Sequence, residues 1–334
     1  MNVEKILIVR FSSIGDIVLA TSPLRTIRTL YPNAHISFLT LEKFAPLLEF
    51  HPDIDCLLSI NHKASMKYIW EYGKYIVKNK YDIIYDLHNS IRSNIIISQS
   101  RKSIIHQLKK PRLKRALLFY LHTNLFEKGF NTRFMYHQYL GINLNENRTI
   151  PETYLSVRQF EKQKAKQRLL RSGIIDDYIV VIPGAAWHQK QWEAKKYVKT
   201  LNEIGMPSVL VGSKMDIICD EIGNNLDNAI NISGKTDIRE ALAIIANAKY
   251  VLGSDTGLVH AAEAMKKKVT IILGPTSSET GADVIHPDSK LVEKDIWCRP
   301  CSQNGSFPCY RKKQYCMDNI EPEDVLRQMQ IESH

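Results

Sequence analysis

The sequence predicts an α/β protein made of two doubly wound domains, each a parallel sheet with helices on both faces. Short, continuously apolar runs alternate along the chain with segments whose apolar residues recur at helical spacing. The 334 residues, 44% of them apolar, suit two cores better than one. A polar stretch containing a proline, Glu146–Thr153, interrupts the alternation. We therefore expect one domain over residues 1–150 and a second over 151–334.

The first half begins with a strand, a loop and a helix. Lys5–Arg10 reads KILIVR, an apolar run of strand length. Asp16–Leu30 repeats apolar residues at helical spacing and stops before Pro32. The same alternation continues with a strand at His35–Thr40, a helix at Met66–Lys78 and a strand at Tyr81–Leu87.

The second half repeats this organisation after a charged amphipathic helix. That helix spans Ser156–Arg171 and is closed by Gly173. The elements that follow are expected as strand Tyr178–Ile182, helix Trp192–Ile204, strand Ser208–Val211, helix Met215–Asn224, helix Ile238–Ala246, strand Tyr250–Leu252, helix Leu258–Met265, strand Val269–Leu273 and a closing helix over 321–331. In such sheets ligands bind beyond the carboxyl ends of the strands, here in a cleft between the domains.

The positive charge lies entirely in the first half. Residues 1–150 carry 21 Lys and Arg against 11 Asp and Glu, whereas residues 151–334 carry 24 of each, and the net charge is +10. Residues 87–126 contain no acidic residue, and their basic residues are Arg92, Arg101, Lys102, Lys109, Lys110, Arg112, Lys114 and Arg115. Such a segment suits an anionic partner, and the apolar run Leu117–Leu121 favours a membrane surface over nucleic acid. A solvated basic helix without a partner is the alternative.

Two common nucleotide motifs are missing from the chain, as are targeting signals. The loop Phe11–Asp16 has one glycine where a dinucleotide fingerprint needs three, and no P-loop occurs. Asp16 in that loop is either a proton acceptor for a hydroxyl nucleophile or a helix cap. The sequence has no run of about 18 apolar residues and no signal-peptide pattern, so we expect a cytoplasmic protein.

Three loops of the second half carry candidate ligand contacts. Lys190 follows the turn Pro183–Ala186 and could place a charge on a diphosphate, or could be an ordinary surface lysine. Asp216 follows a strand end, where an acidic residue can bind ribose hydroxyls or can start a helix. In Gly253–His260 a helix begins after a strand, and its free N–H groups form an anion site. His260 could donate to a phosphate or pack in the core.

Together these loops resemble the ADP-heptose:lipopolysaccharide heptosyltransferases, glycosyltransferase family 9. The resemblance rests on ILIVRFSSIGDIVLATSP at the start, on PGAA through Lys190 and Trp192, and on GSDTGLVHAAEA followed by LGPT. It implies a GT-B architecture of two Rossmann-like domains, with the acceptor bound by the first and the nucleotide sugar by the second. It also implies a metal-independent inverting transfer of heptose from ADP-heptose to a lipopolysaccharide inner-core hydroxyl, without a cofactor, by a monomer at the inner face of the cytoplasmic membrane.

The resemblance assigns roles residue by residue. Asp16 would be the general base and Lys190 would stabilise the departing diphosphate, while Ser13 and the eight basic residues would face the anionic acceptor. The donor would be bound by Ala185, Ala186, Lys190, Asp216, Asp255, Thr256, Gly257, Leu258 and His260. Ala185 and Ala186 depart from relatives that carry hydroxyl residues there, so another donor sugar stays possible. Transfer to a protein or other glycan, and a non-enzymatic binder of nucleotides or acidic polymers, are the alternatives.

Four of the six cysteines lie in a polar, basic loop over residues 298–316. They are Cys298, Cys301, Cys309 and Cys316. The first pair has the spacing of zinc ligands, but the second is spaced too widely for a usual zinc ribbon. We expect no metal in the site itself, and for this loop free or packed thiols, a structural zinc and a disulfide all remain open.

Overall fold

The structure is a computed structural model that describes residues 3–141 and 150–329. The chain forms two compact units: unit 1 comprises Met1–Lys110 and Thr132–Ser156, and unit 2 comprises Pro111–Asn131 and Val157–His334. The sequence placed all of residues 1–150 in one domain. The structure instead assigns Pro111–Asn131 to unit 2, because that segment contacts Glu279 and Trp297. Residues 146–149 of the expected linker lie outside the described residues.

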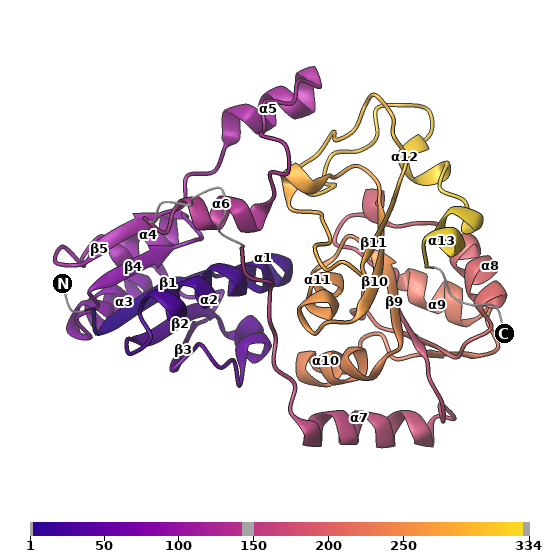
Figure 1. Cartoon of the computed structure of the whole chain (residues 1–334), viewed down its shortest axis with the longest axis horizontal. Coiled ribbons are helices and arrows are strands. Elements are labelled where there is room, and N and C mark those ends of the chain that lie inside the picture. The colour runs from indigo at the N-terminus through magenta and orange to yellow at the C-terminus, as the bar shows by residue number, and fades with distance from the viewer. Residues whose placement is uncertain (1–2, 142–149, 330–334) are drawn as a thin grey trace. The chain divides into compact units, whose positions relative to one another are not determined.

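Unit 1 is built on a sheet of five parallel strands. These are β1 (Lys5–Val9), β2 (His35–Leu41), β3 (Cys56–Ile60), β4 (Ile83–Asp86) and β5 (Ile104–Gln107), in the order β3-β2-β1-β4-β5. The helices are α1 (Ile14–Leu19), α2 (Thr21–Leu30), α3 (Met66–Lys78), α4 (Ile91–Ile97) and α6 (Thr132–Gln138), with a 3₁₀ helix at Glu42–Leu48 (Figure 1). Strands β2 and β3 are added on one side of β1, and β4 and β5 are then added on its other side. The doubly wound prediction is therefore confirmed.

The single helix expected at Asp16–Leu30 is two helices. The hydroxyl of Thr21 donates to the carbonyl of Val18 at 2.6 Å, at the junction between α1 and α2. Pro23 then lies in the first turn of α2, where its missing N–H has no intrahelical role. The periodicity continued through this junction, which explains why the sequence pattern did not reveal it.

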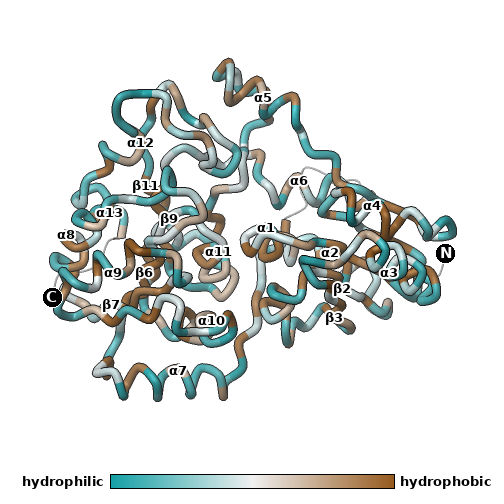
Figure 2. Tube along the Cα trace, turned by 180° about the vertical axis from the view of Figure 1, so that it is seen from behind, coloured by the Kyte–Doolittle hydropathy of each residue, from teal (hydrophilic) through white to brown (hydrophobic). Residues whose placement is uncertain are grey.

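Unit 2 repeats the same topology with one strand more. Its parallel sheet has the order β11-β10-β9-β6-β7-β8, with strands β6 (Ile179–Ile182), β7 (Ser208–Leu210), β8 (Ala229–Asn231), β9 (Tyr250–Ser254), β10 (Lys268–Leu273) and β11 (Lys290–Glu293). The helices are α5 (Arg112–Leu121), α7 (Gln159–Arg171), α8 (Ala194–Ile204), α9 (Ile217–Gly223), α10 (Ile238–Asn247), α11 (Gly257–Ala264), α12 (Tyr315–Asp318) and α13 (Pro322–Met329). The central strands are apolar and buried, and they form the brown interior of the tube in Figure 2.

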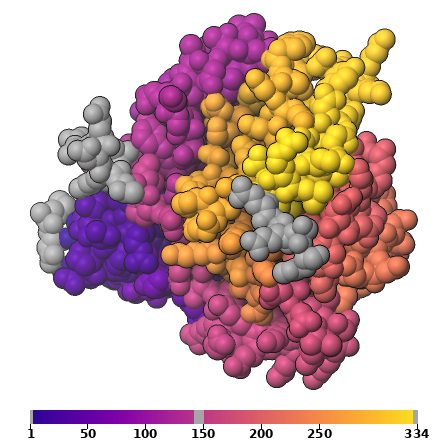
Figure 3. Space-filling model, turned by 45° about the vertical axis from the view of Figure 1, so that its right-hand side comes forward, coloured from indigo at the N-terminus to yellow at the C-terminus, as the bar shows by residue number. Residues whose placement is uncertain are grey.

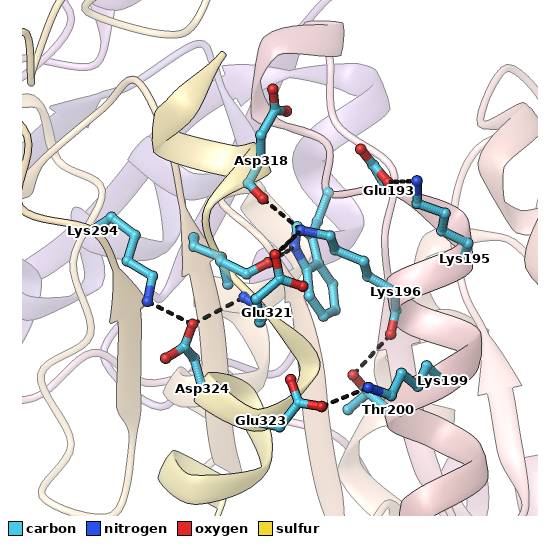
Figure 4. A network of polar contacts seen from close by, with 12 residues as sticks. Glu193, Lys195, Lys196, Lys199, Thr200, Lys294, Asp318, Glu321, Glu323 and Asp324 are labelled. Carbon is cyan, nitrogen blue, oxygen red and sulfur yellow. Dashed lines mark hydrogen bonds and ion pairs between the residues drawn. The ribbon is translucent and has the colours of Figure 1, made fainter. Parts of the chain in front are cut away.

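The closing helix α13 is fastened to α8 by a buried lysine. Lys196 of α8 donates to the carbonyls of Asp318 and Ile320 at 2.6 and 2.9 Å and to the carboxylate of Glu321 at 3.0 Å (Figure 4). The indole N–H of Trp192 also donates to Ile320. An ammonium has three protons to donate, so these three acceptors satisfy it and allow its burial.

None of the helices within residues 3–141 and 150–329 has the length and apolar character needed to cross a lipid bilayer.

Candidate functional site

The candidate residues gather at equivalent places in the two sheets. In unit 1 the winding direction reverses between β1 and β4, and in unit 2 it reverses between β6 and β9. Loops at such a switch point diverge and leave room for a ligand beyond the carboxyl ends of the strands. Asp16 follows β1, Lys190 follows β6, and Asp255 follows β9.

Asp16 is a partly exposed carboxylate in a polar setting. Its Oδ2 accepts from the backbone N–H and the hydroxyl of Ser13 at 3.1 and 3.0 Å, and pairs with Arg10 Nη2 at 2.7 Å. Its Oδ1 accepts from the hydroxyl of Tyr136 at 3.2 Å. Ser13 is the N-cap of α1, and Asp16, at the third helical position, accepts the Ser13 N–H in a capping box, so Asp16 supports the helix start without being its cap residue. The side chain is nevertheless 35% exposed, which leaves it accessible to a ligand.

The charge of Arg10 sets the protonation state of Asp16. Burial by itself would raise the pKa of this carboxyl, but the Arg10 guanidinium and the hydrogen bonds from Ser13 outweigh burial and lower the pKa. Arg10 is in turn fixed by a 2.6 Å hydrogen bond from its Nη1 to the carbonyl of Leu87, after β4. Asp16 is therefore ionised at neutral pH, in the form that can accept a proton.

A neutral histidine lies close to this pair. The His88 ring packs edge-on against Phe11 with centroids 5.0 Å apart. Burial and the positive charges of Arg10 and Lys110 lower the pKa of His88 to about 4. The backbone N–H of His88 donates to the buried Asp86 carboxylate at 3.0 Å, which fixes the loop after β4. Its Nδ1 is buried and has no hydrogen-bond partner among the described residues.

The eight basic residues expected to face an anionic partner are divided between the units. Arg92 lies on α4 and donates to the carbonyl of His62 at 2.7 Å, while Arg101 and Lys102 are exposed in the turn before β5. Lys109 and Lys110 follow β5 and complete the unit 1 set. The other three, Arg112, Lys114 and Arg115, belong to α5 of unit 2.

In unit 2 the structure brings Lys190, Asp255 and His260 together. Lys190 Nζ lies 2.6 Å from Asp255 Oδ2, and His260 Nε2 lies 3.6 Å from Asp255 Oδ1. Thr276, after β10, donates its hydroxyl to Asp255 Oδ2 at 2.9 Å. The Asp255 side chain is only 8% exposed, and the charge of Lys190 lowers its pKa far below the usual value despite the opposing effect of burial. The cluster is therefore a buried, hydrogen-bonded ion pair.

The start of α11 lies beside this cluster. Thr256 is its N-cap and Gly257 and Leu258 are its first residues, so their N–H groups lack intrahelical acceptors. Thr256 Oγ1 and His260 Nδ1 are buried and have no hydrogen-bond partner within the described part of the chain. Helix N–H groups together with such unpaired polar atoms suit an anionic ligand.

Ala185, Ala186 and Asp216 lie in neighbouring loops of unit 2. Ala186 is exposed after β6, and the Ala185 carbonyl accepts from Gln191 Nε2 at 3.3 Å. Asp216 is the N-cap of α9 and accepts the Ser213 N–H at 2.6 Å, as the helix-start alternative anticipated. A Cβ at Gly184 would collide with the Asp216 carboxylate, so this glycine allows the loops after β6 and β7 to approach.

The cysteine-rich loop, residues 298–316, supports the Lys190 cluster from one side. Arg299 donates to the carbonyls of Thr276 and Lys294 at 3.0 and 2.8 Å, and the Cys301 N–H donates to Pro275 at 3.1 Å. Gly305 has φ +80° and lies so near Lys190 that a Cβ there would approach its Cγ to 2.6 Å. The loop thus fixes Thr276 and confines the lysine stem.

All six cysteines are free thiols, and the four of this loop line one small cavity. Burial raises the pKa of Cys301 to about 11, and burial also raises that of Cys316. Among residues 3–141 and 150–329 no three His, Cys, Asp or Glu side chains are placed to share a metal ion. Cys301 and Cys316 are therefore protonated thiols at neutral pH.

Sequence analysis missed four residues that position the candidates, three of them by direct contact. Arg10 was counted as the end of an apolar strand, although a charged residue in that position is itself a signal of a ligand-facing strand end. Tyr136 contacts Asp16 from 120 residues away, and Thr276 contacts Asp255 from 21 residues away. Arg299 lies 44 residues from Asp255 and acts through the backbone carbonyl of Thr276. Their spacing carries no pattern that could have indicated these contacts.

The comparisons with known proteins agree on one family. The model of glycosyltransferase family 9 (heptosyltransferase) matches residues 69–310. Lipooligosaccharide heptosyltransferase 2 of Haemophilus ducreyi is 28% identical over 299 residues, covering 82% of this chain and 84% of the relative. Lipopolysaccharide heptosyltransferase 3 of Escherichia coli K12 is 25% identical over 284 residues, covering 78% and 80%.

Solved structures show the same fold. The E. coli ADP-heptose lipopolysaccharide heptosyltransferase II superposes with a TM-score of 0.77 at 21% identity, covering 97% of both chains. A family 9 glycosyltransferase of Veillonella parvula gives a TM-score of 0.73 at 20% identity, covering 87% and 86%. The fold class is thus that of the two-domain GT-B glycosyltransferases.

The chain belongs to glycosyltransferase family 9, the heptosyltransferase family. It is therefore an enzyme that transfers a glycosyl group, and the alternative of a non-enzymatic binder is set aside.

Proposed function

We propose that this enzyme transfers a heptose from ADP-heptose to a hydroxyl of a lipopolysaccharide inner-core acceptor, with inversion at the anomeric carbon. The names of the curated relatives support the sugar and the acceptor class. The observation that carries the proposal is the pair of aspartates at the two switch points, one partly exposed and one enclosed with a lysine. Unit 1 would supply the base and unit 2 the donor site.

Asp16 would accept the proton of the attacking hydroxyl. The acceptor oxygen forms a bond to the anomeric carbon, its proton passes to the Asp16 carboxylate, and the bond from that carbon to the diphosphate oxygen breaks. Since the low pKa of Asp16 makes it a weak base, it acts as the hydroxyl becomes acidic during attack rather than before it. A single displacement of this kind inverts the anomeric centre.

Unit 2 would stabilise the leaving ADP. The diphosphate gains negative charge as the bond breaks, and Lys190 provides a cation whose position is fixed by Asp255. The N–H groups at the start of α11, with the Thr256 hydroxyl and His260 Nδ1, would donate hydrogen bonds to the phosphate oxygens. These groups supply the charge that a divalent ion supplies in metal-dependent transferases, so we propose a metal-independent reaction.

The test is a direct transfer assay. We would incubate the enzyme with a panel of nucleotide sugars and deep-core lipopolysaccharide acceptors, in the presence of a chelator, and measure product mass. A heptose mass increase with ADP-heptose supports the proposal, and the absence of any mass increase contradicts it. The anomeric configuration of the product, read by NMR, tests inversion, because retention would exclude single displacement.

The acceptor decides between two activities of the same site. If a polypeptide or another glycan gains the heptose and lipopolysaccharide does not, the runner-up activity is correct. We further propose that the enzyme works at the cytoplasmic face of the inner membrane, where a lipid-linked acceptor would be presented.

A further inference from the structure

A second basic segment without acidic residues lies in the cysteine-rich region. Residues 296–317 contain Arg299, Arg311, Lys312 and Lys313 and no Asp or Glu. Three aromatic side chains of this segment are exposed to solvent: Trp297 is 66%, Phe307 46% and Tyr310 62% exposed. Arg311 lies over the Trp297 ring at 5.6 Å and over the Tyr315 ring at 4.3 Å. Arg299 is enclosed and paired with Glu293, so the surface of the segment combines the exposed Lys312 and Lys313 and the partly exposed Arg311 with large apolar side chains.

Helix α5 has the same character and is part of the same unit. Leu113, Leu117, Tyr120 and Leu121 follow the spacing i, i+4, i+7 and i+8, which places them on one helical face. Leu113, Tyr120 and Leu121 are 65–75% exposed. Leu118, which lies outside this stripe, is the buried residue of α5. In Figure 2 this helix shows hydrophobic and hydrophilic residues side by side.

The cations of α5 border its apolar stripe. At 100° per residue, Arg112 and Lys114 lie about 100° to either side of Leu113. Both are exposed, and the acid-free sequence of residues 87–126 leaves no carboxylate on this helix. A short helix with an apolar stripe between basic edges is typical of segments that lie in a membrane interface.

The two segments adjoin each other. The His122 ring at the end of α5 packs edge-on against Trp297 with centroids 5.3 Å apart, and Trp297 lies 6.4 Å from Tyr310. Asn124 donates to the Glu279 carboxylate at 2.7 Å, which further ties α5 to unit 2. Figure 3 shows the yellow and orange-yellow C-terminal segments of unit 2, which include the cysteine-rich loop, at the surface. We call Leu113, Tyr120, Leu121, Trp297 and Tyr310, with the cations around them, the amphiphilic face.

The composition of this face selects its partner. A second copy of the chain would bring two positively charged faces together, which electrostatic repulsion opposes. Nucleic acid would use the cations and stack on aromatics, but it has no use for Leu113 and Leu121. An anionic bilayer uses every component, because the cations meet the headgroups, Trp and Tyr favour the interface, and the leucines enter the acyl boundary.

We propose that the amphiphilic face docks the enzyme on the surface of an anionic lipid bilayer. The inference rests on the proposed function only because a lipid-linked acceptor would explain why the enzyme docks on a bilayer. It assigns membrane contact to α5 and the cysteine-rich loop, both in unit 2. Vesicle binding and sugar transfer can therefore succeed or fail independently.

The test is co-sedimentation of the full-length enzyme with vesicles. Vesicles of phosphatidylcholine containing phosphatidylglycerol should bind the enzyme, and vesicles of phosphatidylcholine alone should bind it at least about 10-fold more weakly. The double variant Leu113→Ser/Leu121→Ser should lose about 10-fold or more of the anionic-vesicle affinity, since two leucines no longer enter the bilayer. The matched control is Ile175→Ser, which removes an equally exposed (71%) apolar residue elsewhere on unit 2.

Transfer to a soluble, delipidated core oligosaccharide separates docking from catalysis. The double variant should retain wild-type activity on that acceptor and lose activity on acceptor embedded in vesicles. Equal vesicle binding by the wild type, the double variant and the control would overturn the proposal. So would RNA binding that displaces the vesicles, or a dimer that the double variant dissociates. Vesicle binding without any sugar transfer would leave the docking inference standing and contradict the proposed function alone.

Discussion

The two sheets of this enzyme share a topology but use their switch points differently. In unit 1 the acidic group, Asp16, lies in the first turn of α1, and its partner Arg10 directly follows β1. In unit 2 the ion pair joins two loops, with Lys190 after β6 and Asp255 after β9. The Asp16 side chain is 35% exposed and that of Asp255 is 8% exposed. Asp16 is thus the more accessible of the two aspartates, whereas Asp255 is enclosed and paired with the Lys190 ammonium.

The largest expected effect is a loss of catalytic rate in a variant of unit 1 alone. Asp16→Asn keeps an oxygen acceptor for Ser13 and Arg10 but cannot take a proton, so we expect kcat to fall about 10²–10⁴-fold. ADP affinity should change little, whereas the melting temperature should fall, because the Arg10 side chain, only 7% exposed, loses the charge of its carboxylate partner. Steady-state ADP release, calorimetric ADP binding and thermal denaturation test this. A variant that retains more than a tenth of the wild-type kcat would remove Asp16 from the role of base.

Breaking the ion pair of unit 2 should affect rate and stability together. Lys190→Met removes the cation near the diphosphate and leaves Asp255 as a buried, unpaired carboxylate. We expect a loss of about 10²–10³-fold in kcat and about 3–5 kcal/mol in the free energy of unfolding. Chemical denaturation and ADP release measure the two effects. The comparison of the units fails if Asp16→Asn destabilises the protein more than Lys190→Met does.

A fall in pH should destabilise unit 1 before unit 2, because the two units contain different titratable groups. Burial and the charge of Arg25 lower the pKa of His51 in unit 1 to about 4, against 6.5 for an ordinary histidine. The neutral ring is preferred in the folded state, so its contribution is complete above pH 6.5 and is lost as the pH falls toward 4, at most about 3 kcal/mol. The lowered pKa of Asp255 in unit 2 acts only below about pH 4.

Hydrogen exchange resolved by unit tests this order. Unit 1 should lose protection between pH 6.5 and 4, before unit 2. His51→Asn keeps an acceptor for the Asp53 N–H and removes one titrating ring, so it should weaken the pH dependence of unit 1, while His88, whose pKa is also about 4, keeps its own contribution. Equal loss of protection in both units over this range would contradict the assignment.

The smallest effects come from a matched pair of hydroxyl deletions. Tyr136→Phe removes the hydrogen bond to Asp16, and Thr276→Val removes the one to Asp255. Each should cost about 1 kcal/mol. We expect Tyr136→Phe to change the pH dependence of kcat, since it touches the base, and Thr276→Val to raise the KM for donor through Lys190. Interchanged effects would mean that the roles of the aspartates are interchanged.

The strands that could be predicted from the sequence are the buried ones. The central strands of both sheets were predicted because their residues are apolar on both faces. The four strands that escaped prediction, β3, β5, β8 and β11, are the edges of the two sheets. Edge strands are half-exposed and short, as in Ala229–Asn231, so no continuous apolar run marks them.

The candidate site divides in a similar way. Asp16, Lys190, Asp255 and His260 lie at or just after the turns that follow β1, β6 and β9, in recognisable local motifs, so the family resemblance located them. Their partners Tyr136 and Thr276 come from distant segments and contribute one hydroxyl each. Such contacts depend on tertiary packing, which leaves no trace in local spacing.

The excursion of Pro111–Asn131 from unit 1 into unit 2 has a practical consequence for dissecting the enzyme. The chain passes between the units at three points, after residues 110, 131 and 156. A fragment ending at Ser156 would carry α5 away from its partners Glu279 and Trp297, and a fragment starting at Val157 would lack it. Separate expression of the two halves therefore requires excising residues 111–131 from the first fragment and supplying them to the second.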